Sequence, residues 1–111
     1  MINKLDFNLR TPLTIELIAG WHHDRNLIKG STNAQQFVKL IEEVGELAAS
    51  IARGKCVKDD IGDVMTVLIN IAEREGVTIH QCLATAWKDI KDRKGKMVDG
   101  VFIKEADLCE K

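Results

Sequence analysis

The sequence has little of what marks a disulfide-stabilised, zinc-binding or nucleic-acid-binding protein. Its three cysteines, Cys56, Cys82 and Cys109, contain no Cys-x-x-Cys pair, and such a set fits neither a disulfide framework nor a zinc ribbon. Positive charge is not in excess, because 16 Lys and Arg residues face 17 Asp and Glu residues, which gives a net charge of -1. No surplus is left to neutralise the phosphates of a nucleic-acid polymer, so we do not expect one as a partner.

A long apolar run is also missing. The longest stretch, residues 64–72, is interrupted by Thr66 and Asn70 and is far too short to span a bilayer. Residues 1–6 contain no apolar core of the kind that a secretory signal needs. We therefore expect a cytoplasmic protein with reduced cysteines and no membrane partner.

The composition is that of an ordinary globular domain. The 111 residues are 45% apolar and 30% charged, which is sufficient for one domain with a real core. No internal repeat, linker or low-complexity segment interrupts the chain. Residues 1–111 are therefore predicted to form a single helical domain.

Helical patterns fill most of the chain. Thr11 and Pro12 are a typical cap and first helical residue, and the predicted helices cover residues 11–23, 34–52, 58–75 and 78–92. Asp99 and Gly100 are the turn signal of a short hairpin within residues 97–102. The predicted fold is all-α, a four-helix bundle with a short C-terminal β-hairpin-like appendage.

Two of the predicted helices have extensive apolar surfaces. The helix over residues 34–52 carries one apolar stripe, made of Phe37, Leu40, Val44, Leu47 and Ile51. The helix over residues 58–75 is apolar around most of its circumference, which is typical of a central helix buried on several sides. So broad an apolar surface in a chain with four helices predicts a homodimer or a homotetramer.

Two acidic clusters lie within these apolar patterns. At ~100° per residue, Glu42, Glu43 and Glu46 share roughly a third of one helix's circumference. Asp60 and Asp63 have a three-residue spacing on the next helix. The short connection between the helices makes them antiparallel neighbours, so the two clusters can face each other. Carboxylates gathered in this way repel one another unless a cation lies between them, and oxygen ligands favour Mg2+ or Mn2+.

Each acid also has an ordinary interpretation. Asp60 could simply favour the positive N-terminal end of its helix, and Glu42 or Glu46 could pair with a nearby lysine or arginine. Asp63 fits this interpretation least, because it lies within a run that should be buried. A ferritin-like di-iron centre is disfavoured, since the chain lacks the Glu-x-x-His pairs that such a centre uses.

The acidic motifs resemble those of a known family. The segment over residues 39–48, KLIEEVGELA, followed by DIGDV over residues 60–64, looks like the signature of MazG-like nucleotide pyrophosphohydrolases. This all-α superfamily also contains the dimeric dUTPases and the dCTP pyrophosphatases, and the resemblance covers about residues 21–93. The family pattern is Glu-Glu-x-x-Glu, a spacer and Glu-x-x-Asp, so Asp60 stands where the family has glutamate.

The resemblance implies a reaction and roles for the acids. Family enzymes split a nucleoside triphosphate into the monophosphate and pyrophosphate. By this resemblance, Glu43, Glu46, Asp60 and Asp63 hold Mg2+, and Asp60 binds it either directly or through water. Glu42, Glu43 and Glu46 form the catalytic set, in which Glu42 supports the metal ligands or is the base that orients water. In similar proteins a neighbouring subunit completes the substrate pocket.

Candidate substrate contacts lie outside the acidic motifs. Lys39, one turn before Glu43, could contact phosphate or balance the acidic charge. Asn70, two turns after Asp63, could contact the base or sugar, or it could bond to a backbone carbonyl. The last candidates end the fourth helix, where similar proteins contact base and phosphates: Trp87, Lys91, Arg93 and Lys94. Trp87 could stack on a base, although a tryptophan on a helix face more often belongs to the core.

Two functions remain open from the sequence. One is a metal-dependent nucleotide pyrophosphohydrolase. The other is a non-catalytic helical interaction module, derived from a MazG-like fold, in which Asp60 has weakened metal binding. Pyrophosphate release from nucleoside triphosphates distinguishes them.

Overall fold

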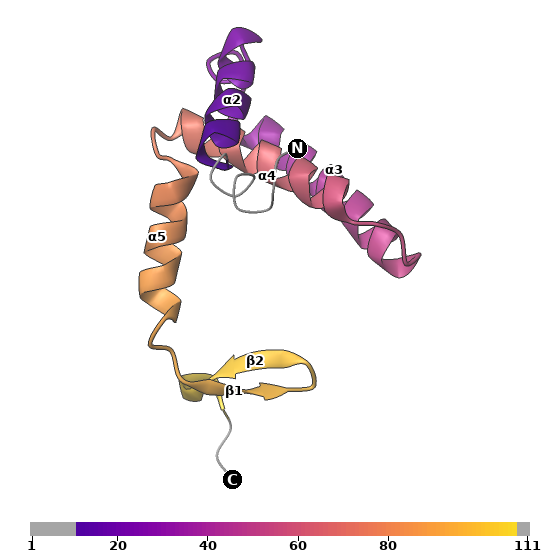
Figure 1. Cartoon of the computed structure of the whole chain (residues 1–111), viewed down its shortest axis with the longest axis vertical. Helices are drawn as coiled ribbons and strands as arrows, with labels where there is room; N and C mark the ends of the chain where they lie inside the picture. The colour runs from indigo at the N-terminus through magenta and orange to yellow at the C-terminus, as the bar shows by residue number, and fades with distance from the viewer. Residues whose placement is uncertain (1–10, 109–111) are drawn as a thin grey trace, which may run out of the picture. The chain divides into compact units, whose positions relative to one another are not determined.

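The computed structural model describes residues 11–108, and helices make up most of this range (Figure 1). Four α-helices come first, and a two-stranded antiparallel hairpin and a short 3-10 helix follow. The elements in chain order are α2 (Thr11–Asp24), α3 (Asn33–Ala52), α4 (Lys58–Arg74), α5 (Ile79–Ile90), β1 (Gly95–Val98), β2 (Val101–Lys104) and η1 (Glu105–Asp107). The predicted all-α fold with a C-terminal hairpin is confirmed. Residues 1–6, whose composition argued against a secretory signal, and Cys109 lie outside the described range.

The described residues fall into two compact units, and the division along the chain lies between Ile79 and His80. The first unit contains α2, α3 and α4, and the second contains nearly all of α5 and the hairpin. The single domain over residues 1–111 stays a prediction. None of the helices within residues 11–108 is long and apolar enough to cross a membrane. Cys56 and Cys82 are free thiols.

The α3–α4 pair is the framework of the first unit. Helix α3 begins with a capping box, in which the Thr32 hydroxyl accepts from the Gln35 backbone N–H and the Gln35 side chain accepts from the Thr32 N–H. The helix ends at Ala52, and Gly54 just beyond it has a φ of +64°, in the left-handed region. The Lys55 N–H then donates to the Ser50 carbonyl oxygen over 2.9 Å, which closes the helix end and turns the chain back toward α4.

Helix α4 is central in this unit, as predicted, because it packs against both α3 and α2. Its buried apolar residues are Val67, Ile69 and Ala72, and together with Ala19 and Ile79 they form most of the core. The prediction that the whole helix is buried is confirmed only for its later part. Ile61, in the first turn, remains 49% exposed, because α2 packs against the later part of the helix.

The apolar stripe of α3 splits lengthwise in the structure. Leu40 and Leu47 are half-buried, whereas Phe37, Val44 and Ile51 are exposed. Ile41 is also exposed and lies beside them on the helix. One edge of the predicted stripe therefore lies at the half-buried side of α3, and the other edge is open to solvent in a single chain.

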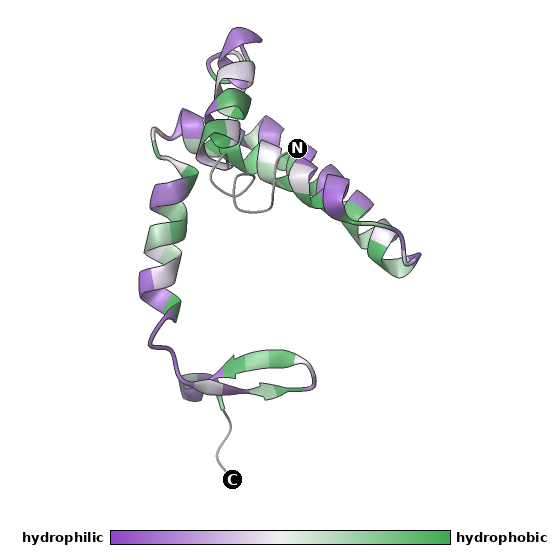
Figure 2. Cartoon of the chain, in the orientation of Figure 1, coloured by the Kyte–Doolittle hydropathy of each residue, from purple (hydrophilic) through white to green (hydrophobic). Residues whose placement is uncertain are grey.

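The second unit consists of an amphipathic helix and the hairpin. Hydrophobic and hydrophilic residues alternate along α5 (Figure 2), and Leu83, Trp87 and Ile90 are exposed at helical spacing. The predicted Asp99–Gly100 turn is present, with φ of 50° at Asp99 and 82° at Gly100. Positive φ at both central residues is typical of the type I′ turn that matches the twist of a hairpin.

Candidate functional site

Three of the predicted metal ligands come together between α3 and α4. Glu43 and Glu46 lie one turn apart on α3, and Asp63 faces them from α4. Each offers a carboxylate oxygen, and these oxygens all lie within 4.8 Å of one another. Glu43 is only 7% exposed, Asp63 is half-buried and Glu46 is exposed. The antiparallel packing of α3 and α4 therefore brings together acids that are 17 to 20 residues apart in the sequence.

The fourth predicted ligand, Asp60, is not part of this group. It lies three residues before Asp63 on α4, at a half-buried position. Glu42 is also outside the group, because its position on α3 directs it to the exposed surface, and its side chain is 61% exposed. The ligand role of Asp60 and the catalytic role of Glu42 stay predictions.

The cluster of Glu43, Glu46 and Asp63 carries negative charge that is not balanced. Glu43 Oε2 is buried, and no donor among residues 11–108 reaches it. The pKa of the Glu46 carboxyl is raised, chiefly by the negative charge of Glu43 and by a hydrogen bond to Glu43. The pKa of the Asp63 carboxyl is also raised, first by burial and then by the charges of Asp59 and Glu43. These shifts mean that the carboxyl groups of Glu46 and Asp63 resist ionisation beside Glu43.

Lys39 supplies positive charge to this group. Its Nζ lies 3.1 Å from Glu43 Oε1 and 3.8 Å from Glu42 Oε2. The hydrogen bond to Glu43 and the charges of both glutamates raise the pKa of the Lys39 ammonium. One unit charge still leaves the cluster acidic. A buried, unpartnered carboxylate oxygen among hard oxygen ligands fits a divalent cation.

A pocket of about 410 Å3 adjoins the acids. Glu43 and Asp63 line one part of it together with Lys39, and the apolar side chains of Leu27 and Val67 line another. The pocket is also lined by Trp21, His22, Gln36 and Thr66. Its volume is within the range of small-molecule sites, and it combines apolar walls with a few polar groups.

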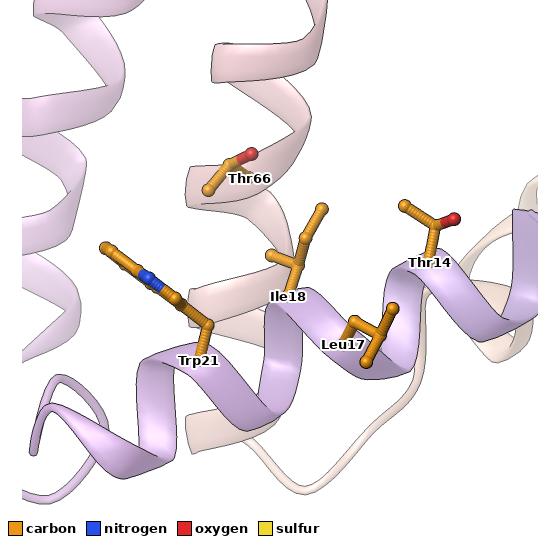
Figure 3. Close-up of a pocket in the computed structure, with 5 residues that line it drawn as sticks. All are labelled: Thr14, Leu17, Ile18, Trp21 and Thr66. Carbon is orange, nitrogen blue, oxygen red and sulfur yellow. The ribbon is translucent and has the colours of Figure 1, made fainter.

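Trp21 forms a wall of this pocket and of a second one. The second pocket, of about 380 Å3, is lined by Thr14, Leu17, Ile18, Trp21 and Thr66. Figure 3 shows Ile18 and Trp21 extending from α2 toward the part of α4 that carries Thr66. The Arg25 guanidinium lies 4.3 Å from the centroid of the Trp21 ring and makes a cation–π contact with it. Trp21 is 46% exposed.

Buried hydrogen bonds fix α2 against α4 beside the pocket. The His22 Nε2–H donates to the Thr66 carbonyl oxygen over 3.0 Å, so Nδ1 accepts from the Asn70 amide over 3.2 Å. Asn70 has no exposed surface, and its amide also donates to the Leu27 carbonyl oxygen over 3.0 Å. Asn70 therefore makes the backbone bond that was one of its two predicted roles, and its contact with substrate stays a prediction.

Arg74 fixes the loop that leads into α3. Its guanidinium donates to the carbonyl oxygens of Ile28 over 2.9 Å and Leu27 over 2.6 Å. A third bond runs to the Asn33 side chain over 3.0 Å. Leu27 is thereby held at the pocket wall, and the first turn of α3 is held against α4.

The remaining predicted substrate contacts belong to the second unit. Trp87 is 61% exposed, and Lys91 and Lys94 are exposed as well. Arg93 pairs with Asp89 one turn earlier on the chain. Their contacts with substrate stay predictions.

Six of the nine residues that line the pocket beside the acids were not among the predicted site residues, and Gln36 and Trp21 are two of them. Gln36 lies seven residues before Glu43, so helical spacing alone places it on the same face of α3 and was the available signal. Trp21 offered no such signal, because it reaches the pocket through the packing of α2 against α4, which are more than 30 residues apart in the chain.

Comparison with known proteins identifies the family of the helices that carry this site. A family model described as the MazG nucleotide pyrophosphohydrolase domain matches residues 32–98, which is more than half of the chain. The match contains α3, α4, α5 and the first strand of the hairpin.

One curated relative is an uncharacterized 18.2 kDa protein encoded in the rep-hol intergenic region of Haemophilus phage HP1 (strain HP1c1). It is 42% identical over 65 residues, which cover 57% of this chain and 40% of the phage protein. The chain thus spans less than half the length of that relative. No solved structure matched this chain significantly. The family match covers both acidic motifs and the helices that carry them, and the chain belongs to the MazG nucleotide pyrophosphohydrolase domain family.

Proposed function

We propose that this protein is a Mg2+-dependent pyrophosphohydrolase. It would split ribo- or deoxyribonucleoside triphosphates ((d)NTP) into the nucleoside monophosphate and pyrophosphate. The observation that carries the proposal is the group of Glu43, Glu46 and Asp63 beside a pocket of about 410 Å3. Family enzymes typically depend on a divalent metal. Mn2+ could replace Mg2+, because both prefer oxygen ligands.

Glu43, Glu46 and Asp63 would hold the cation, and Asp60 is the candidate for a further ligand. A bound divalent cation neutralises phosphate charge, polarises the attacked phosphoryl group and lowers the pKa of a coordinated water. Glu46 is one candidate for the base that accepts the proton of this water. Glu42, exposed on the neighbouring turn of α3, is the other candidate base.

The nucleoside would occupy the adjoining pocket. Trp21 and Leu27 offer surfaces for a base, and Gln36 offers an amide to its polar edge. Lys39 lies at the acidic part of the pocket, where the phosphates would lie. We retain Lys91, Arg93 and Lys94 as proposed phosphate contacts and Trp87 as a second proposed aromatic surface.

We also propose that the protein assembles as a homodimer or homotetramer. The exposed residues Phe37, Ile41, Val44 and Ile51 form an apolar surface along α3. Single exposed apolar side chains are normal on a protein surface, whereas a contiguous apolar patch marks an interaction site. It would be covered by a second copy of the chain.

Pyrophosphate release from a panel of ribo- and deoxyribonucleoside triphosphates with Mg2+ tests the activity. We expect turnover by the wild type and background rates for Glu43→Gln and Asp63→Asn. Glu16→Gln is the matched control, because it removes the same charge from an exposed position on α2. If no nucleotide is hydrolysed with Mg2+ or Mn2+, the non-catalytic interaction module is the better description.

A further inference from the structure

The ion pair between Lys39 and Glu43 has a geometry that contributes little to helix stability. The two residues are four apart on α3, with the lysine nearer the N-terminus. This order is the weaker one for an i, i+4 pair, because the charges oppose the helix dipole. The Lys39 side chain is also 50% exposed, so water competes for its ammonium group. The pair is therefore easily broken.

The same ammonium nevertheless occupies a critical position. Glu43 is buried, and Lys39 provides the hydrogen bond to its Oε1 while Oε2 has no donor within residues 11–108. The positive charge of Lys39 also acts against the raised pKa values of Glu46 and Asp63. In the metal-free protein Lys39 thus offsets part of the repulsion among all three carboxylates.

A divalent cation and this ammonium cannot share Glu43 without strong repulsion. A cation held by Glu43, Glu46 and Asp63 would carry two positive charges to within a few ångströms of the Lys39 Nζ. The Lys39 side chain is half exposed and lines the adjoining pocket, so its ammonium group has both the freedom and the space to move away.

We propose that Lys39 is an exchangeable counter-cation: it neutralises Glu43 in the metal-free protein, and a divalent cation displaces it into the adjoining pocket. There the released ammonium meets the phosphate chain of the substrate, a consequence that rests on the proposed function. Metal binding would then prepare the pocket for phosphate, because it creates a free positive charge that the metal-free protein does not offer.

The first test is calorimetric titration of metal-free protein with Mn2+ in the absence of nucleotide. Lys39→Met removes the competing charge and keeps the chain length, so we expect it to bind Mn2+ roughly two- to fivefold more tightly than wild type. Lys29→Met, at an exposed position in the loop before α3, makes the same change in net charge and should leave the affinity unaltered. An affinity for Lys39→Met that equals or falls below that of Lys29→Met overturns the proposal.

The second test measures binding of tripolyphosphate at saturating Mn2+. We expect Lys39→Met to bind it more weakly than wild type, and Lys29→Met to match wild type. Equal binding by Lys39→Met overturns the second half of the proposal. Thermal unfolding confirms that each variant is folded. If Lys39→Met does not fold, Lys39→Gln replaces it in both titrations. If the wild type hydrolyses no nucleotide but Lys39→Met binds Mn2+ more tightly than wild type, the proposed activity is refuted. The proposed exchange of Lys39 for a divalent cation then still stands.

Discussion

The Asn70 amide donates to the Leu27 carbonyl oxygen over 3.0 Å, from a side chain with no exposed surface. This bond joins α4 to the loop that forms one wall of the pocket. It also places the Asn70 amide within 3.2 Å of His22 Nδ1, so a single side chain connects α2, the loop and α4.

Asn70→Ala should therefore destabilise the fold. The substitution leaves His22 Nδ1 without its buried donor and opens a small cavity, which costs about 1–3 kcal/mol of unfolding free energy. Urea denaturation measures the change. Arg74 still donates to the Leu27 carbonyl oxygen, so the loop should stay in place. Unchanged stability together with a raised KM for nucleotide would instead assign Asn70 to substrate binding.

Trp21 is predicted to be the principal base contact. If it stacks on the base, Trp21→Ala should raise KM about tenfold or more, since stacking contributes ~1–3 kcal/mol per base. Nucleotide binding should also quench tryptophan fluorescence in a Trp87→Phe background, where Trp21 is the remaining tryptophan. Quenching that disappears in this background, with KM dependent on Trp87, would assign the stacking role to Trp87.

Asp60 is one methylene too short to match the family pattern, and it lies outside the carboxylate group. Asp60→Glu should bring its carboxylate toward the other three and tighten Mn2+ binding by up to about tenfold. The matched change at the adjacent exposed acid, Asp59→Glu, should have little effect. Calorimetric titration with Mn2+ compares the variants. Weaker binding by Asp60→Glu would indicate that Asp60 already ligates the metal through its present geometry.

The raised pKa values predict a pH dependence of stability. Because the folded protein holds protons on Glu46 and Asp63 to higher pH than the ordinary values of 4.5 and 3.8, it binds more protons than the unfolded chain. Their contribution to the unfolding free energy therefore falls as pH rises from those values through the raised ones. At neutral pH the metal-free protein bears the full repulsion.

Glu46→Gln removes one of the repelling charges. The Tm of the metal-free variant at pH 7 should exceed that of wild type by roughly 1–4 °C, and the difference should shrink toward pH 4. Differential scanning fluorimetry across this pH range measures it. Glu16→Gln, on the surface of α2, should show neither effect. A lower Tm for metal-free Glu46→Gln would contradict the electrostatic interpretation.

The exposed apolar surface of α3 predicts how copies associate. Ile41→Lys places a charge in this surface and should shift the protein to monomers, because burying an unpaired charge is costly. Leu13→Lys is the matched control, since Leu13 is 55% exposed, as Ile41 is 56% exposed, but lies on α2 and not in the α3 surface. Light scattering at micromolar concentration gives the mass. A wild-type monomer, or an unaltered mass for Ile41→Lys, would count against the assembly.

The elements of this fold were predictable because their signals are local. The capping residue Thr32, the glycine at position 54 and the Asp99–Gly100 turn each act on the backbone within a few residues. Apolar spacing then defined the helices between them. The carboxylates at positions 43, 46 and 63 followed from the same local rules, because a short connection forces two successive helices to pack as antiparallel neighbours.

Other features depend on contacts between distant parts of the chain. Periodicity could not reveal that α2 packs on the later part of α4, which brings Trp21 to the pocket and leaves Ile61 half exposed. It also could not divide the α3 stripe into a half-buried edge and an open one. Nor could it give Asn70 its partners, since His22 and Leu27 lie more than 40 residues away.

The order of residues along the chain thus specified the helices, the hairpin and the acids that face each other, because hydrogen bonding and side-chain spacing within one helix or turn are set by near neighbours. Packing decided which acids share a site. It buried Glu43, placed Lys39 against it and left Asp60 outside, because burial and the distance between charges exist only once helices meet. Those two quantities give the site its electrostatics, and with them its capacity to hold a cation.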